Sequence, residues 1–269
     1  KDNDEIIVDV EEVYSKTEQY IEENKNTLTV LVGAVLLIVG GYFGYSNLYL
    51  APLEEEAQSQ MWQAEKYFEV DSFNLALNGN IQGAIGFKTI ADHYGRTKAG
   101  NLANYYCGIS FYNLGQYQEA LNYLEAFNSN DKMVGPIATG AIGNCYMELN
   151  DVNQALEYYK KASNQSMNDF TGPMFRLKAG FAAEKLGQND VALELYKSIK
   201  TDFPSSQEAL QAVSSAKIIY IELGRVDDYA TWVDRLDFVN IENSETLRGY
   251  TALLAAEHDD SGKDFHEGF

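Results

Sequence analysis

Turn-forming residues recur along most of the chain at a nearly constant spacing. They stand at Gly79, Gly115, Asn150, Gly187 and Gly224, which are separated by 36, 35, 37 and 37 residues. A small residue follows each of the first four turns by five positions, and a glycine precedes three of them by seven. These small residues are Ala84, Ala120, Ala155, Ala192, Gly108, Gly143 and Gly180. Such a period predicts a stack of similar units rather than one globular core.

Each unit has the pattern of a helical hairpin. Two apolar-periodic stretches flank a tight break, as in the segment YYCGISFYNLGQYQEALNYLEAF. The break needs a left-handed residue, which glycine or asparagine supplies at low steric cost, and the small residues are expected where two helix axes come close. Pro136 and Pro173 are expected at the start of first helices, and Pro204 is expected to end a second helix. We therefore predict an all-α fold.

On these residues the chain resembles the tetratricopeptide repeat (TPR) family, whose unit is about 34 residues long. The resemblance runs from about Met61 to Tyr229 and implies an α-solenoid of about four to five helical hairpins. The first unit, 61–100, contains an insertion-like link through Asp71–Asn80, and Tyr229 occupies a small-residue position in the fifth. The clearest units are 101–135, 136–172 and 173–207.

A second feature precedes the repeats, because no charged residue stands between Lys25 and Glu54. About 20 apolar residues, at ~1.5 Å each, cross a bilayer core of ~30 Å. We predict a single transmembrane helix at 27–50, with a buried core helix as the alternative. A cleavable signal peptide is disfavoured because it has a basic start and a shorter apolar stretch. Aromatic residues that favour the headgroup level lie at the far end, at Tyr42, Phe43, Tyr45 and Tyr49.

The distribution of cations predicts an orientation for this helix. Lys16 and Lys25 precede it closely, whereas the first cation after it is Lys66. The N-terminus is therefore expected in the cytoplasm and the repeats across the membrane. The predicted domains are a cytoplasmic acidic segment (1–26), the transmembrane helix (27–50), the TPR domain (51–224) and an acidic C-terminal helical cap or tail (225–269).

Gly33, Gly40 and Gly44 predict a packing face on the transmembrane helix. Small residues at such spacing let a second helix approach closely within lipid. The alternative is that glycine is simply common in membrane helices.

Composition excludes several classes of function. The 20 Lys and Arg against 40 Asp and Glu give a net charge of −20, which repels nucleic acid. Phosphate-loop, zinc-protease and nucleophile-elbow motifs are missing from the sequence, which has two cysteines and three histidines. We expect no cofactor, no metal and no enzymatic activity, and we expect Cys107 and Cys145 to be buried free thiols.

Stacked hairpins present a concave groove lined by the first helix of each unit. Asn144 and Lys178 are the only polar residues of the kind that family members use to clamp an acidic C-terminus, so we expect an apolar peptide or helix as ligand. The alternative is that the groove residues pack against neighbouring repeats or a capping helix. The family pattern implies that the groove residues are Tyr105, Ile109, Tyr112, Asn144, Met147, Met174, Leu177 and Phe181.

An anchor followed by an acidic TPR domain resembles the YfgM family of ancillary proteins of the bacterial Sec translocon. The most similar segments are GFKTIADHYGRTKAGNLANYYCGISFYNLGQYQEAL and LKAGFAAEKLGQNDVALELYKSIKTDFPSS. The resemblance implies a non-catalytic scaffold of the inner membrane with a periplasmic TPR domain. Its partners would be translocon subunits and a membrane-anchored periplasmic chaperone of the peptidyl-prolyl isomerase type, and it would assist newly exported proteins.

Two alternatives stay open. One is another cell-envelope scaffold, which serves cell division or outer-membrane protein export. The other is an import receptor on an organelle surface, whose TPR domain faces the cytosol.

Overall fold

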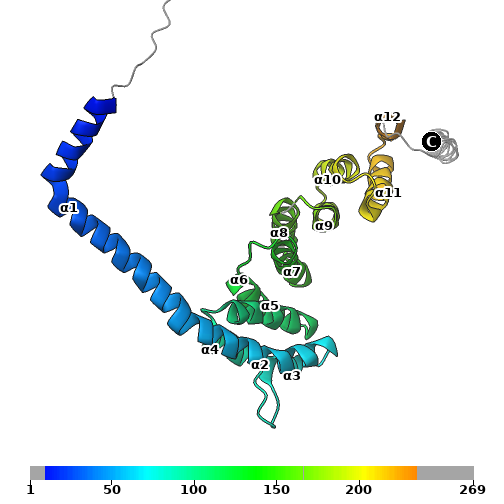
Figure 1. The fold of residues 1–269 in the computed structure, drawn as a ribbon. Helices are drawn as coiled ribbons and strands as arrows, with labels where there is room; N and C mark the ends of the chain where they lie inside the picture. The colour runs from blue at the N-terminus through cyan, green and yellow to red at the C-terminus, as the bar shows by residue number, and fades with distance from the viewer. Residues whose placement is uncertain (1–9, 166, 235–269) are drawn as a thin grey trace, which may run out of the picture.

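A long helix leads into a stack of helical hairpins (Figure 1). The computed structural model describes residues 10–165 and 167–234. Within these residues every regular element is helical, and the only β pairing is an isolated bridge between Gly79 and Ile85. The first nine residues of the predicted cytoplasmic segment, and the predicted cap or tail beyond residue 234, lie outside the described part of the chain.

The predicted boundary between anchor and repeats lies inside one continuous helix. The helix α1 (Val10–Gly44) passes through a π-helical segment, η1 (Tyr45–Leu50), into α2 (Ala51–Glu69). In η1 the amide of Ala51 donates to the carbonyl of Ser46, one residue farther back than in an α-helix. Pro52, which has no amide hydrogen, follows directly, and a widened turn accommodates its ring.

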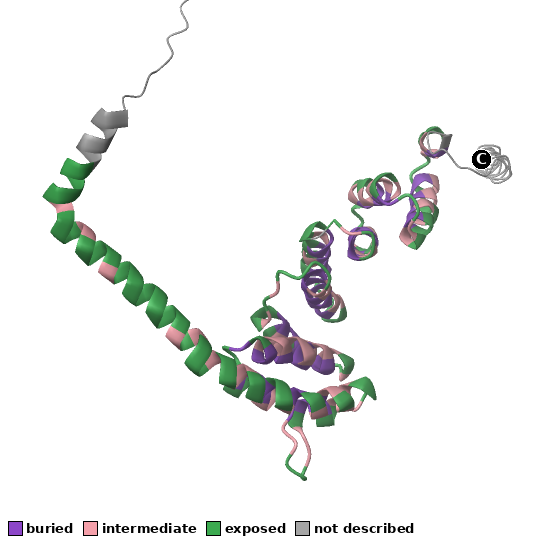
Figure 2. Cartoon of the chain, viewed as in Figure 1, coloured by how far each residue is buried: buried purple, intermediate pink, exposed green. Residues whose placement is uncertain are grey.

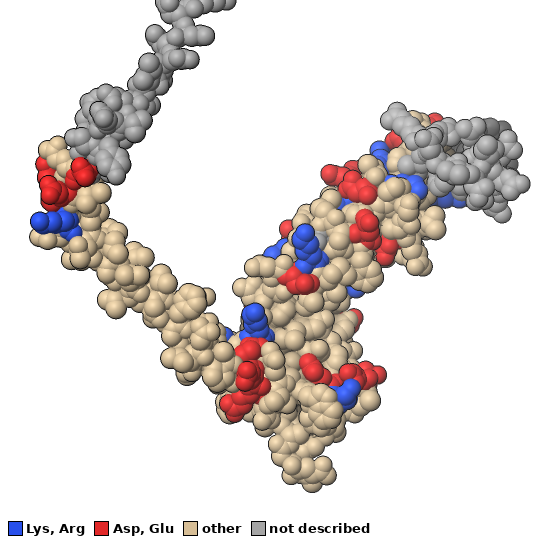
Figure 3. All heavy atoms as spheres, viewed as in Figure 1, with Lys and Arg blue, Asp and Glu red and all other residues tan. Residues whose placement is uncertain are grey.

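The apolar segment of α1 is exposed along its length (Figure 2). No residue of its most apolar window is buried, which is not the pattern of a core helix. It carries neither acidic nor basic side chains, in contrast to the regions on either side (Figure 3). Among the described helices, this is the one that is long and apolar enough to cross a membrane.

The turn residues of four hairpins adopt the expected left-handed conformation. Gly115, Asn150, Gly187 and Gly224 have φ angles of 75°, 60°, 70° and 65°. The prediction from their spacing is therefore confirmed for these four units. The hairpins are α5 (Lys98–Asn113) with α6 (Tyr117–Ala126), α7 (Val134–Glu148) with α8 (Val152–Gln165), α9 (Thr171–Lys185) with α10 (Asn189–Asp202), and α11 (Gln207–Glu222) with α12 (Val226–Asp234).

The first unit departs from the predicted hairpin. Gly79 ends a short helix, α3 (Phe73–Asn78), and Ala84 lies in the following loop rather than in a second helix. The next helix, α4 (Phe87–Tyr94), begins only after that loop. The side-chain oxygen of Asn80 accepts hydrogen bonds from the amides of Gln82 and Ala84, at 2.9 and 3.1 Å. These bonds hold the segment in a turn, because the side chain competes with helical hydrogen bonding.

Large side chains of the second helices pack directly over glycines of the first helices. A Cβ atom at Gly180 would lie 2.2 Å from the ring of Tyr196, and one at Gly143 would lie 2.7 Å from the ring of Tyr159. Tyr196 is fully buried. The prediction that helix axes come close at these small residues is confirmed.

The prolines also lie where the sequence predicts them. Pro136 and Pro173 stand in the first turns of α7 and α9, where no helical partner exists for their missing amide hydrogen. Pro204 follows the end of α10 at Asp202. The apolar core continues through the stack as two clusters, one centred on α2–α7 and the other on α8–α12.

The close packing of Tyr196 over Gly180 gives the first prediction. Gly180→Ala is expected to lower the free energy of unfolding by about 1–3 kcal/mol, because the buried ring of Tyr196 must move. Gly187→Asn is the matched control, since Asn150 already adopts that left-handed turn and the Cβ position at Gly187 is open. The control should change the free energy by less than about 0.5 kcal/mol. Urea unfolding followed by circular dichroism measures both, and equal losses would contradict the packing argument.

Candidate protein-interaction surface

The stack has two different sides. The backbones of the first helices α5, α7, α9 and α11 approach one another in sequence, whereas those of the second helices α6, α8 and α10 do not. The first helices therefore form one continuous surface, and clefts separate neighbouring second helices.

Most predicted groove residues lie half-buried on the first helices. These half-buried residues are Tyr105, Ile109, Tyr112, Asn144, Met147 and Met174. Phe181 is the most accessible, with 44% of its surface exposed. Leu177 is only 6% exposed and belongs to the apolar core, so its placement in the groove is wrong.

Tyr105 and Tyr112 pack against aromatic neighbours. The ring of Tyr105 lies 5.4 Å from that of Phe127, and the ring of Tyr112 lies 5.6 Å from that of Tyr117. Burial raises the pKa of both hydroxyls, and at Tyr112 the nearby Glu148 adds to the effect. Both tyrosines are therefore neutral at physiological pH and contribute to packing between helices.

Asn144 joins two neighbouring units. Its side-chain oxygen accepts hydrogen bonds from the hydroxyl of Tyr159 at 2.9 Å and from Nζ of Lys178 at 2.8 Å. Burial lowers the pKa of Lys178. The two residues of the incomplete carboxylate clamp therefore bind each other, which holds the Lys178 ammonium at the seam between α7 and α9.

A stripe on α9 offers the clearest contact surface on this side. Lys178, Phe181 and Lys185 are three and four residues apart, so they share one face of the helix. Nζ of Lys185 lies 3.9 Å from the sulfur of Met147 on α7. We call these three residues the α9 stripe. An exposed aromatic ring between two cations suits a partner with an apolar side chain beside acidic groups.

The opposite side carries two clefts that sequence reasoning missed. The α6–α8 cleft has a volume of about 300 Å³ and is floored by α7. The α8–α10 cleft has a volume of about 410 Å³ and is floored by Arg176 of α9. Both lie between second helices, whereas the family pattern drew attention to the first helices.

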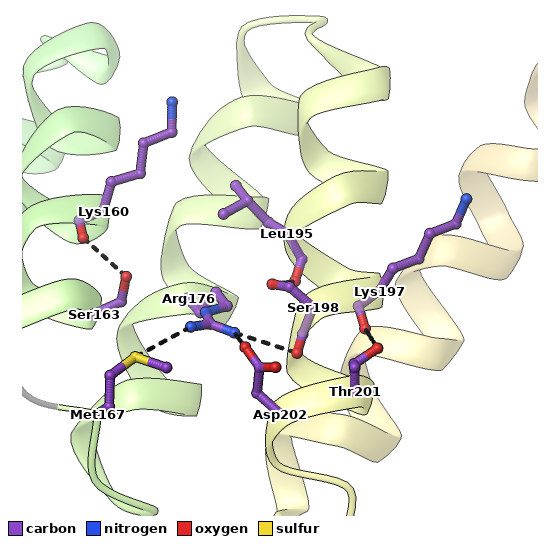
Figure 4. A network of polar contacts seen from close by, with 9 residues as sticks. All are labelled: Lys160, Ser163, Met167, Arg176, Leu195, Lys197, Ser198, Thr201 and Asp202. Atoms are coloured by element: carbon purple, nitrogen blue, oxygen red, sulfur yellow. Dashed lines mark hydrogen bonds and ion pairs between the residues drawn. The ribbon is translucent and has the colours of Figure 1, made fainter. Parts of the chain in front are cut away.

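Arg176 forms a buried polar network beneath the α8–α10 cleft (Figure 4). Only 6% of it is exposed. Its Nη1 donates to the carboxylate of Asp202 and, at 3.2 Å, to the carbonyl of Ser198. The guanidinium lies 5.1 Å from the ring centre of Phe203, and Nη2 lies 3.7 Å from the sulfur of Met167. The network ties the C-terminal end of α10 to α9.

The burial of Arg176 could be inferred from the sequence by comparing equivalent positions of the repeats. Arg176 stands four residues before Gly180, and the equivalent residue before Gly143 is the uncharged Thr139. Thr139 is also buried, and its hydroxyl donates to the side chain of Gln165. A charge at a position that is buried in the neighbouring unit indicates an internal ion pair.

The cysteines behave as the sequence predicts. Cys107 and Cys145 are free and buried. Burial raises the pKa of both thiols, to about 12 for Cys145. In the described part of the chain, no group of three or more His, Cys, Asp or Glu side chains is placed to hold a metal ion.

Comparison with known proteins identifies TPR units in the chain. Residues 140–164 and residues 176–206 each match a tetratricopeptide repeat family model. No curated protein matches the chain. Two crystal structures of nearly identical TPR-like repeats, from a protein described as a kinesin light chain of Podosopora anserina, are among the similar solved structures. One of the two is a single-substitution variant.

Both structures share 14% sequence identity with the chain, cover 68% of it, and superpose with a TM-score of 0.49. The alignments cover 93% and 94% of those chains. The TPR units are identified by the two family models, and the described residues around them are helical.

The Arg176 network predicts an asymmetric response to substitution. Asp202→Asn is expected to cost about 3–5 kcal/mol of unfolding free energy, because it leaves the Arg176 charge buried without a counterion. Arg176→Met should cost less, since the carboxylate of Asp202 is 40% exposed and water can solvate it.

Glu69→Gln is the control, because its ion pair with Lys66 is exposed and should contribute at most about 1 kcal/mol. Chemical unfolding of the three variants measures these differences. A smaller loss at Asp202 than at Arg176 would contradict the assignment of the buried charge.

Proposed function

We propose that this protein is a non-catalytic, single-pass scaffold of the bacterial inner membrane and an ancillary subunit of the Sec translocon. The N-terminus lies in the cytoplasm, and the TPR domain lies in the periplasm. There it binds a membrane-anchored chaperone or exported clients.

One observation carries this proposal. The exposed, charge-free segment of α1 runs through η1 into α2 without a break, and α2 packs against α3, α4 and α5. A soluble protein that exposes so long an apolar helix would aggregate, whereas lipid covers it at no cost. The same helix supplies both the membrane span and a structural element of the stack, as expected for an anchored scaffold.

The polypeptide partners are proposed to bind at two places. Within lipid, Gly33, Gly40 and Gly44 have open space at their Cβ positions, which allows a translocon helix to approach closely. Outside lipid, the α9 stripe offers Phe181 as an aromatic anchor between two cations. The half-buried tyrosines and methionines of the first-helix face support the stripe by packing.

Protease protection tests the orientation. In spheroplasts with an intact inner membrane, added protease is expected to digest the TPR domain and to leave the N-terminal segment 1–26 protected. The alternative of a receptor requires a repeat domain on the cytoplasmic side of the membrane. Such a domain would be protected in spheroplasts and digested only in inverted vesicles. A cytoplasmic protein serves as the control for membrane integrity.

Substitution in the α9 stripe tests the binding surface. Phe181→Glu is expected to reduce copurification of the periplasmic chaperone about tenfold, because it places a charge at the apolar anchor. Phe170→Glu is the matched control, since Phe170 is 58% exposed and lies outside the stripe. Native-membrane purification with quantitative mass spectrometry measures the yield. Equal yields from the two variants, both with an unchanged melting temperature, would exclude the stripe as the site.

A further inference from the structure

The first charged residue after the apolar segment is bonded to the stack. This residue, Glu54, lies in the first turn of α2, and its carboxylate accepts hydrogen bonds from the amides of Lys98 and Ala99, at 2.6 and 3.3 Å. The carboxylate of Glu56 accepts a hydrogen bond from the hydroxyl of Tyr94 at 3.0 Å. These bonds hold the end of α4 and the start of α5 beside the start of α2 (Figure 1).

This part of the stack lies at the depth of the lipid headgroups if α1 spans the membrane as proposed. Glu54 follows Leu50, the last residue of the apolar run, by four residues, which is about 6 Å along the helix axis. The headgroup layer on each side of a hydrocarbon core of ~30 Å is about 5–8 Å thick. Residues 93–98, which we call the α4–α5 link, therefore meet the membrane surface.

Two cations of the α4–α5 link are available to a ligand. Arg96 and Lys98 are exposed, and in the described part of the chain neither side chain forms an ion pair or a hydrogen bond. They flank the buried Thr97, which caps α5 by accepting a hydrogen bond from the amide of Gly100 at 2.9 Å. Because Glu54 and Thr97 already bind the first three amides of α5, an anion must bind the two side chains rather than the helix N-terminus.

Acidic side chains beside the link restrict the choice of ligand. Glu55 on α2 and Asp92 on α4 are exposed, so this surface carries charges of both signs. The carboxylates repel a strongly anionic surface, whereas the headgroup of phosphatidylethanolamine presents a phosphate and an ammonium group together. An arginine binds phosphate through two parallel hydrogen bonds, and a lysine binds it as a point charge. A zwitterionic phospholipid therefore suits the link.

We propose that Arg96 and Lys98 bind the phosphate of a zwitterionic phospholipid headgroup at the membrane surface. The inference rests on the transmembrane placement of α1 in the proposed function and adds a second contact with the bilayer. The first helices of the stack are then held against the membrane at two points. One is α2, which continues the membrane helix, and the other is the α4–α5 link, which binds headgroups.

Quenching of fluorescent reporters in the full-length protein tests the position of the link. The protein is reconstituted into vesicles of phosphatidylethanolamine and phosphatidylcholine that contain a lipid with a nitroxide on its headgroup. A bimane label at His93→Cys is expected to be quenched at least about threefold more than one at Gln118→Cys. Gln118 is the matched control, because it is exposed at the opposite end of the hairpin that α5 begins. The native thiols of Cys107 and Cys145 are buried and protonated, so they do not react.

A third reporter distinguishes failure of this proposal from failure of the proposed function. A label at Val35→Cys, in the apolar segment, is expected to be quenched by a lipid with a nitroxide on its acyl chain. No quenching at Val35 would refute the membrane span and, with it, the lipid contact. Quenching at Val35 together with equal quenching at His93 and Gln118 would leave the span intact and overturn the lipid contact alone.

Removal of the two cations tests the ligand. Arg96→Gln combined with Lys98→Gln is expected to weaken the binding of phosphatidylethanolamine to the full-length protein in detergent about tenfold, because charge-assisted hydrogen bonds to the phosphate are lost. Lys161→Gln combined with Lys185→Gln is the matched control, since it removes the same charge from exposed positions on α8 and α9. Lipid titration followed by native mass spectrometry measures the affinity. Equal affinities of the two double variants would overturn the assignment of the phosphate to Arg96 and Lys98.

Discussion

The contact between a first-helix glycine and the large side chain opposite it sets the geometry of the stack. At Gly108 the neighbour is Leu124, at Gly143 it is Tyr159, and at Gly180 it is Tyr196. In each case a single added carbon would overlap the neighbour, so the helices of a hairpin pack at a distance that only glycine permits. The left-handed turns join the two helices of each hairpin, and successive first helices approach one another along the stack.

Within this framework, the surface divides into packing and contact regions. Tyr105 and Tyr112 on α5 are half-buried because they pack against the rings of Phe127 and Tyr117 in the same hairpin. Phe181 is 44% exposed, with its ring 6.1 Å from that of Tyr196 on α10. Arg176 has the opposite role, since its buried charge fixes the end of α10 and does not reach a partner.

Much of this arrangement could be predicted from the sequence, because left-handed turns and close helix contacts accept few residue types. The placement of Leu177 could not, since α9 is buried around most of its circumference and periodicity does not distinguish its faces. The pairing of Arg176 with Asp202 spans 26 residues and depends on how two helices stack. The end of the apolar run at Leu50 marks a change of composition, but helical hydrogen bonding continues to Glu69. The loop at Asn80 was also not predictable, because it depends on one side chain that binds the amides of Gln82 and Ala84 in place of helical carbonyl groups.

The unbroken passage from α1 to α2 has a mechanical consequence for an anchored protein. The 19 residues of α2 extend about 28 Å, and the helix continues into them from the apolar segment of α1 without a loop. If α1 spans the bilayer as proposed, rotation of α1 about its own axis would therefore move the whole stack sideways. A partner helix that binds the proposed transmembrane segment would then determine the direction in which the stack points.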